Sequence, residues 1–373
     1  MQSQPKIPKS VDFTGHNFYN GIDVHKKQWT VTTRVDGTYL KTYTLTPSPE
    51  ALVKHLQTNY PNGNYFSAYE AGFCGTSYHT KLCELGIKNI IINPADLPLT
   101  NKLKTNRTDL HDSRALAEFL EAGKLHPIHI FPVDHQELRS LCRLRSTKRM
   151  DTTRSNNRIK SMLMYYGITV PEPFKKSKCW SRRFLNWLKE LKLTTAAGTT
   201  CLQYLISDLE YNRTQLLAVL KAIRKILPQC AADKLMDLLR SIPGIGPISA
   251  ITLISEIGDM SRFKSEAHLS SFIGLLPSES SSGETITVKG INPRCNVYLR
   301  TILMEAAWIA IRHSPSLLAY YKKHAYNDNS NKAIVKVARK LTMIVRAVWL
   351  SGKPFEEDYQ TKKQEKTADL KPE

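Results

Sequence analysis

The sequence predicts an α/β domain over residues 13–132, a basic helical or coiled-coil arm over residues 133–234 and a mainly helical domain over residues 235–353. Strand and helix patterns alternate only in the first segment, and the second segment has no strand signal. The third segment is helical on both sides of a Ser-, Gly- and Thr-rich interruption at residues 276–292. Residues 354–373 have mixed charge and few groups to bury, so we predict a disordered tail.

Alternating patterns in the first segment predict a mixed sheet covered by helices. The runs NFYNGIDV, WTVTTRV and KTYTLT are rich in β-formers and predict a meander, with a turn at Asp36-Gly37. Helical spacing follows in PEALVKHLQTNY, SYHTKLCELG and SRALAEFLEAG, with the strand-like runs YFSAYEA and IKNIIIN between them. Gly86 stands where a glycine commonly ends a helix.

The charge of the chain points to a polyanionic partner. Its 373 residues, enough for two or three domains, include 53 Lys and Arg against 33 Asp and Glu, a net charge of +20. Nucleic acid is the simplest such partner, and ribosomal or membrane-surface binding stays open on charge alone. The first residues, MQSQPKIPKS, have no hydrophobic core that would predict a signal peptide, and no apolar run is long enough to cross a bilayer. The seven cysteines form no CxxC pair. We therefore expect a cytoplasmic protein without a structural zinc site or a disulfide framework.

Half of the excess positive charge lies in residues 136–190, which hold 14 basic and 4 acidic residues. From Arg145 to Arg158 only Met150 is apolar, and such a helix is solvated, paired with another helix or bound to a polyanion. An amphipathic run at residues 202–227 provides the second helix of the predicted arm. The predicted phosphate contacts are Arg143, Arg145, Lys148, Arg149, Arg154 and Arg158.

Aromatic residues of the arm alternate with Lys and Arg. They are Phe174, Trp180, Phe184 and Trp187. They fit two interpretations, stacking on unpaired bases or forming the core of a short amphipathic helix, and we favour the core.

Four acidic residues lie at positions along the predicted strands and helix that suit a metal site. Asp23 lies inside a β run, where an acid is disfavoured, and Glu70 ends a later apolar strand. Asp109 and Asp112 share one face at the start of a helix. Alone, each has a simpler interpretation: an ion pair of Asp23 with a nearby lysine, a turn at Glu70, or helix capping by the last two. Together they favour Mg²⁺, because converging carboxylates repel one another and hard divalent cations neutralise them for phosphoryl transfer.

The segment SIPGIGPISA, residues 241–250, has the pattern of a helix–hairpin–helix motif. In such a motif Gly244 and Gly246 would let backbone N–H groups approach a DNA phosphate at the positive end of the next helix, without reading the base sequence. The alternative is a simple interhelical turn, which the close match over the whole segment disfavours.

The serine-rich segment GLLPSESSSG, residues 274–283, is followed by three basic residues, Lys289, Arg294 and Arg300. A serine near these cations could attack a phosphodiester while the cations stabilise the developing charge. By itself such a run is typical of a flexible linker, but apolar helical patterns flank it on both sides.

The chain resembles the DEDD transposases of the IS110/IS1111/Piv class in the order of its motifs. These are Asp23, Glu70, the Asp109-x-x-Asp112 pair, SIPGIGPISA and GLLP(x)4SG. The resemblance implies an RNase H-like domain of the Holliday-junction-resolvase type, a coiled-coil arm and a C-terminal transposase domain. It further implies that the four acids bind Mg²⁺, that a serine becomes covalently joined to DNA, and that a structured non-coding RNA of the element guides the protein.

Within this resemblance Ser282 matches the nucleophile, because it directly precedes Gly283 and follows Pro277 by five residues; Ser281 is the alternative. No histidine lies nearby in the sequence, so deprotonation would depend on the metal-binding acids, within one chain or between subunits. The chain departs from the pattern in an N-terminal extension, residues 1–16, and in ETITVKG, which is less basic than expected.

Three functions follow: an RNA-guided insertion-sequence transposase, a metal-dependent junction-resolving nuclease without a covalent serine, and a non-catalytic nucleic-acid-binding scaffold. The C-terminal segment favours the first over the second, and the acids disfavour the third because carboxylates repel phosphates. The expected partners are DNA of the element ends and target, a guide RNA and further copies of the chain as a dimer or tetramer, in the nucleoid of a bacterial cytoplasm. No membrane is expected.

Overall fold

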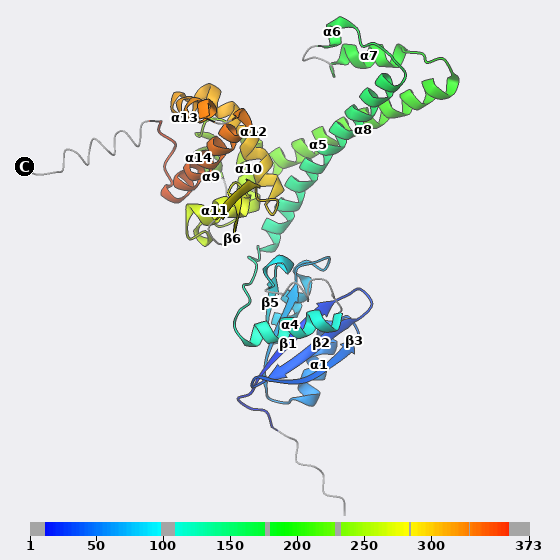
Figure 1. The fold of residues 1–373 in the computed structure, drawn as a ribbon. Helices are drawn as coiled ribbons and strands as arrows, with labels where there is room; N and C mark the ends of the chain where they lie inside the picture. Colours follow the sequence, from blue (N-terminus) through cyan, green and yellow to red (C-terminus); the bar gives the residue numbers. More distant parts are fainter. Residues whose placement is uncertain are drawn as a thin grey trace, which may run out of the picture. The chain divides into compact units, whose positions relative to one another are not determined.

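The computed structural model describes residues 12–97, 109–175, 180–227, 233–282, 285–327 and 329–357. By its internal contacts the chain divides into two compact units, Met1–Ile130 and Phe131–Glu373, and each is described by itself (Figure 1). No helix of the described residues combines the length and the apolarity that crossing a membrane requires.

The first unit is built on a five-stranded mixed sheet with the strand order β3-β2-β1-β4-β5. Its strands are β1 (Asn17–Val24), β2 (Trp29–Val35), β3 (Thr38–Leu45), β4 (Asn64–Glu70) and β5 (Lys88–Ile92). β1, β2 and β3 form an antiparallel meander, whereas β4 pairs in parallel with both β1 and β5. The predicted mixed α/β sheet is therefore confirmed.

Helices cover both faces of this sheet. They are α1 (Pro49–Asn59), α2 (Ser77–Glu84) and α4 (Asp109–Glu121), with a short 3-10 turn η1 (Pro94–Asp96). Alternation along β1 assigns the faces, because Ile22 packs with Leu52 of α1 and Leu82 of α2, while the neighbouring Gly21 meets α4. Gly86 has φ +88° just beyond α2, as its place in the sequence predicts.

The backbone of α4 lies directly on Gly21. A Cβ atom at Gly21 would stand 2.1 Å from the carbonyl oxygen of Ser113 and 2.4 Å from the amide nitrogen of Ala117. A side chain at this position is therefore incompatible with the observed approach of helix and strand.

Two polar contacts give the direction of α4. Near its start, the Ser113 Oγ lies 2.9 Å from Oγ1 of Thr32, the β2 residue that pairs with Gly21. At its end, Glu121 accepts a hydrogen bond of 2.6 Å from Nε of Arg34, which pairs with the first half of β1. Hence α4 runs antiparallel to β1, and its first turn points toward the end of that strand.

In the second unit, two long helices pack side by side as the arm (Figure 1). They are α5 (Val133–Tyr165) and α8 (Ala196–Ile226), joined by a segment that contains α6 (Glu172–Lys175) and α7 (Arg182–Glu190). The buried ring of Phe184 stacks on Trp187 with centroids 5.4 Å apart, and Phe174 and Trp180 contact the same ring. For these aromatics, the interpretation as a small core is confirmed.

The remaining helices of the second unit surround one hydrophobic core. They are α9 (Asp233–Arg240), α10 (Pro247–Ile257), α11 (Glu266–Ile273), α12 (Val297–His313), α13 (Pro315–Asn327) and α14 (Ser330–Ser351), with η3 (Met260–Arg262) and the hairpin strands β6 (Pro277–Ser282) and β7 (Thr285–Ile291). Fully buried Leu253 and Leu303 lie in this core. A smaller cluster joins it to the arm, because Cys142 of α5 and Ile223 of α8 pack with Ile251 of α10.

The structure adds two details to the third segment and the predicted tail. The serine-rich run forms a strand, because β6 and β7 form an antiparallel pair. The β-branched residues of TITVKGI favour a strand, and they pair with a serine run that has no strand signal of its own. The first residues of the predicted tail contact the second unit, since Phe355 donates its backbone N–H to Ser241 Oγ at 2.8 Å and Glu357 accepts from Ser314 Oγ at 2.6 Å. Residues 1–11 and 358–373 lie outside the described residues, so the rest of the predicted tail is not described.

We expect Gly21→Ala to destabilise the first unit, because the added methyl group would occupy the position of the α4 backbone. Overpacking of this kind costs about 1–3 kcal/mol. Gly72→Ala is the matched control, since the nearest atom to its Cβ would be 3.8 Å away. Hydrogen exchange of the β1 and α4 amides should accelerate in Gly21→Ala alone, and exchange at the wild-type rate would contradict the close approach.

Candidate functional site

Two of the predicted acids lie at the carboxyl ends of adjacent parallel strands. The paired register of β1 and β4 runs to the residues directly before Asp23 and Glu70. The Asp23 side chain is 21% exposed, and its Oδ2 lies 3.1 Å from Nε2 of His25. The carboxyl ends of neighbouring parallel strands meet at one sheet edge, where α/β proteins commonly bind their ligands. The structure therefore brings these two acids to one edge.

Both acids belong to the sheet face that α4 covers. Side chains alternate along a strand, so Asp23 shares a face with Gly21, and Glu70 shares one with Ala68. Gly21 lies under the backbone of α4, and Ala68 packs with Leu116 of the same helix.

The first turn of α4 carries the other two acids. Asp112 directly precedes Ser113, the residue over Gly21, and the antiparallel course of α4 directs this turn toward the end of β1 that bears Asp23. The side chain of Asp109 lies outside the described residues. Among the side chains that are described, no three His, Cys, Asp or Glu groups lie close enough to hold a metal ion. The carboxylate oxygens are nevertheless the donor type that Mg²⁺ requires, so the residue set fits this ion.

The glycine-rich turn lies between α9 and α10, but its two glycines have different surroundings. Gly244 has φ +85°, and a Cβ there would stand 2.3 Å from the carbonyl oxygen of Ala306 in α12. The side of Gly244 that would carry a Cβ atom therefore packs on α12. Gly246 is the N-cap of α10, and among the described atoms none lies within 4 Å of its Cβ position.

A buried carboxylate, Glu256 of α10, binds two arginines of α5. It is 0% exposed and accepts hydrogen bonds from Nε of Arg139 at 2.9 Å and from Nε of Arg143 at 2.6 Å. The third residue that donates to it is Asn296, through Nδ2 at 2.8 Å. Asn296 is the N-cap of α12 and follows the β6–β7 hairpin. One acid therefore connects the arm, α10 and the segment after the hairpin.

The ion pairs outweigh the cost of burying Glu256. Burial by itself raises the pKa of Glu256, but the hydrogen bond from Arg143 and the charge of Arg139 leave this pKa below its usual value. The same hydrogen bond raises the pKa of Arg143, whose guanidinium also lies 4.7 Å from the ring centroid of Tyr298. Arg143, predicted as a phosphate contact, is therefore placed as an internal ion-pair partner.

Other predicted contacts on α5 remain open to solvent. Arg149 pairs with Glu305 at 2.6 Å and Arg154 with Asp151 at 3.1 Å, yet the arginine side chains are 45% and 64% exposed. Arg158, one helical turn after Arg154, is also exposed. The two more enclosed members of the predicted set are Lys148 and Arg145.

The hairpin places the predicted nucleophile at a strand end. Ser282 is the last residue of β6, and its side chain, like those of Ser281 and Lys289, lies outside the described residues. Arg300 donates a hydrogen bond to the carbonyl oxygen of Asn292, so this arginine holds the base of the hairpin. The exposed basic residue just after the hairpin is Arg294.

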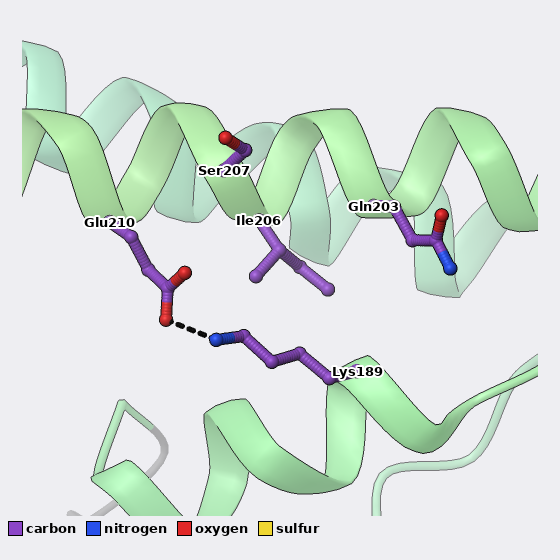
Figure 2. A pocket seen from close by; sticks show the side chains of 5 residues that line it. All are labelled: Lys189, Gln203, Ile206, Ser207 and Glu210. Atoms are coloured by element: carbon purple, nitrogen blue, oxygen red, sulfur yellow. Dashed lines mark ion pairs between the residues drawn. The ribbon is translucent and has the colours of Figure 1, made fainter.

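A groove of about 280 Å³ lies between α7 and α8 (Figure 2). An ion pair of 2.6 Å between Lys189 and Glu210 joins the two helices across it. The other lining residues are Gln203, Ile206 and Ser207. None of the predicted catalytic residues lines this groove, so it is not the candidate active site.

Comparison with known proteins identifies the class of the chain. Residues 20–168 match the DEDD_Tnp_IS110 family, described as a transposase, and residues 236–322 match the transposase IS116/IS110/IS902 family. The protein y4qE of Sinorhizobium fredii is 29% identical over 294 residues, which cover 78% of this chain and 70% of y4qE. The transposase for insertion sequence element IS1111A of Coxiella burnetii is 28% identical over 290 residues, 74% of this chain and 75% of the relative. The pilin gene-inverting protein of Moraxella bovis is 33% identical over 123 residues, 32% and 38% of the two chains.

These matches define a DNA transposase, an enzyme that cuts and rejoins DNA. The fold agrees with this class, since an α/β unit with acids at a sheet edge is followed by a helical unit. The chain belongs to the IS110 family of transposases. The resemblance drawn from the sequence motifs is thereby confirmed.

Glu256 was not among the predicted residues. Its signal in the sequence is a single acid in the otherwise apolar run ISAITLISEIG, with Arg139 and Arg143 one helical turn apart. The partners lie 117 and 113 residues away along the chain, so the sequence pattern alone does not pair them.

We expect Glu256→Ala to destabilise the second unit by about 3 kcal/mol, because it leaves two enclosed guanidinium groups without their buried counter-charge. Glu305→Ala, which removes an exposed pair, is the matched control and should cost less than about 1 kcal/mol. Urea unfolding measures both.

The same cluster predicts a pH dependence. The folded-state pKa of Glu256 is lowered, so its ion pairs stabilise the fold above the ordinary glutamate pKa, and this stability is lost as the pH falls through the folded-state value. The difference between wild type and Glu256→Gln should shrink at acidic pH. A difference that grows on acidification would contradict the pairing.

Proposed function

We propose that this transposase cleaves and rejoins DNA through a covalent bond to Ser282, with Mg²⁺ held by Asp23, Glu70, Asp109 and Asp112 and with a structured RNA of the element as guide. The observation that carries this proposal is the position of Asp23 and Glu70 at adjacent strand ends, on the face that α4 covers. The other two acids lie in the first turn of that helix.

The finer fold assignments belong to the same proposal. The strand order and the acids at the sheet edge support an RNase H-like first unit. The turn between α9 and α10 supports a helix–hairpin–helix in which Gly246 and the first amides of α10 meet a DNA phosphate, since a helix N-terminus carries partial positive charge. In this proposal Gly244 serves packing against α12.

The four acids act by binding and orientation. When bound, Mg²⁺ supplies positive charge at the reacting phosphate. The Oγ of Ser282 loses its proton and forms a bond to phosphorus, the P–O bond to the departing strand breaks, and the departing oxygen takes a proton. Attack on the phosphoserine by the hydroxyl of another strand reverses these bonds and rejoins the DNA. Lys289 and Arg294 would add positive charge beside the phosphate.

Ser282→Ala should abolish the covalent protein–DNA adduct and strand cleavage while DNA binding persists, because the change removes the nucleophilic oxygen and little else. Asp23→Asn should also abolish the adduct, since it removes a negatively charged metal ligand. Ser281→Ala is the matched control and should retain the adduct. Denaturing gels of labelled DNA measure all three.

The variants also separate the alternatives. Cleavage without an adduct in the wild type and in Ser282→Ala would favour the metal-dependent nuclease that resolves junctions. Binding without any cleavage in the wild type would favour the non-catalytic scaffold. An adduct retained in Ser282→Ala but lost in Ser281→Ala would assign the nucleophile to Ser281.

The exposed part of α5 is the proposed RNA contact. Arg154 and Arg158 lie one turn apart on this helix, and Lys160 Nζ lies 5.8 Å from the ring centroid of Trp180. The arm also offers a pairing surface to further copies of the chain, as a dimer or tetramer that handles four strand ends. A monomer in sedimentation with DNA and RNA bound would contradict the assembly.

Arg154→Glu combined with Arg158→Glu should weaken binding of the element's RNA and reduce the log–log salt slope by roughly 0.7–0.9 per lost phosphate contact. The matched control is Lys54→Glu with Lys124→Glu, two exposed lysines of the first unit. Filter binding at several salt concentrations measures the slopes. Equal RNA affinity in the arm variant and the wild type at low salt would restrict the arm to assembly.

A further inference from the structure

A second basic segment follows the hairpin region. Residues 306–355 contain nine Lys or Arg residues and one acid, Asp328. Together with residues 136–190, this segment accounts for most of the net charge of the chain. Neither α13 nor α14 contains an acidic residue, and α14 lies beyond residue 322, where the family match ends.

The cations of α14 form a stripe opposite its buried face. Lys332, Lys336 and Arg339 stand at helical positions i, i+4 and i+7, so they share one side of the helix, and all three are exposed. The buried side of α14 consists of Ala333, Ile334, Val337, Ala338, Leu341, Thr342, Val345 and Val348. The stripe is therefore directed away from the core.

Helix α13 lies beside this stripe and extends it. Nζ of Lys336 lies 3.3 Å from Nδ1 of His324, and Nζ of Lys340 lies 4.6 Å from the ring centroid of Tyr320. These contacts set the two helices antiparallel, and the exposed Lys323 directly precedes His324, which contacts Lys336 of α14. We call the surface of Lys323, Lys332, Lys336 and Arg339 the α13–α14 patch.

The α13–α14 patch differs from the basic helix of the arm. On α5, several cations have acidic partners, such as Glu256 and Glu305. Lys323, Lys332 and Arg339 form no ion pair with any acidic side chain of the described residues. Like charges held this close on rigid helices favour a polyanionic ligand that neutralises them.

We propose that the α13–α14 patch binds the phosphate backbone of double-stranded DNA. The stripe from Lys332 to Arg339 is about 10 Å long, close to three nucleotide steps of one strand. A single-stranded ligand would need a row of exposed rings for base stacking. Here Lys340 lies over Tyr320 and Tyr321 contacts Trp308, so the 92% exposed Tyr326 is a single open ring of α13 and not part of a row.

The test uses the full-length protein and three charge reversals, Lys323→Glu, Lys332→Glu and Arg339→Glu, in one variant. The matched control reverses three exposed lysines of the first unit, Lys54, Lys88 and Lys124, and changes the net charge equally. Short DNA duplexes of two unrelated sequences are titrated at several salt concentrations. A chelator is present, so neither metal binding nor strand cleavage by Ser282 affects the result.

The patch variant should lose affinity for both duplexes, and its log–log salt slope should fall by about two to three units, close to 0.9 for each lost contact. The control should keep the wild-type slope within one unit. A slope unchanged in the patch variant, or an equal fall in the control, would overturn the proposal. Loss of RNA binding with duplex binding intact would assign the patch to RNA and would also overturn it. Circular dichroism verifies that both variants are folded.

Discussion

The contact of α4 with Gly21 is the constraint on which the arrangement of the first unit depends. A helix backbone reaches a strand this closely only where the strand has no side chain, and the Oγ of Ser113 then reaches Thr32 on the next strand. The ion pair of Glu121 with Arg34 holds the far end of the helix. Because rotation and direction of α4 are both restrained, its first turn is held over the sheet edge where β1 and β4 end. The positions of the acids thus follow from packing between backbone atoms.

In the second unit the cations fall into two groups, which the positions of the acids distinguish. Arg139 and Arg143 are held by Glu256 and support the junction of the arm with α10 and α12. The single carboxylate of Glu256 compensates one of these two charges inside the protein, so the two arginines contribute less to the field outside than two unpaired cations would. Neither α14 nor α13 contains an acidic residue. Net charge alone does not distinguish these two groups, whereas the positions of the few acids do.

Much of the fold could be predicted because its signals are local. The strands, the helices of the first unit and Gly86 after α2 follow from residue periodicity and turn chemistry. What could not be predicted depends on partners distant in sequence: the pairing of the serine run with TITVKGI, the packing of Gly244 on α12, and the ion pairs of Glu256. For the candidate site, the order of the acids in the sequence predicts a metal site. The sheet face that these acids occupy could be assigned only from the contact of α4 with Gly21, which the sequence does not reveal.

The length of the arm limits the size of any nucleic acid that follows it from end to end. Helix α5 has 33 residues, which corresponds to about 50 Å at 1.5 Å per residue. For a B-form DNA duplex, that distance equals about fifteen base-pair steps of 3.4 Å. A DNA duplex shorter than about one and a half helical turns therefore cannot reach the root and the tip of the arm together, and an A-form RNA stem needs more base pairs than this, because its rise per base pair is smaller. A nucleic acid bound along the whole arm therefore has to be one long helix or several helices stacked end to end, and the length of the arm sets the minimum length of that structure.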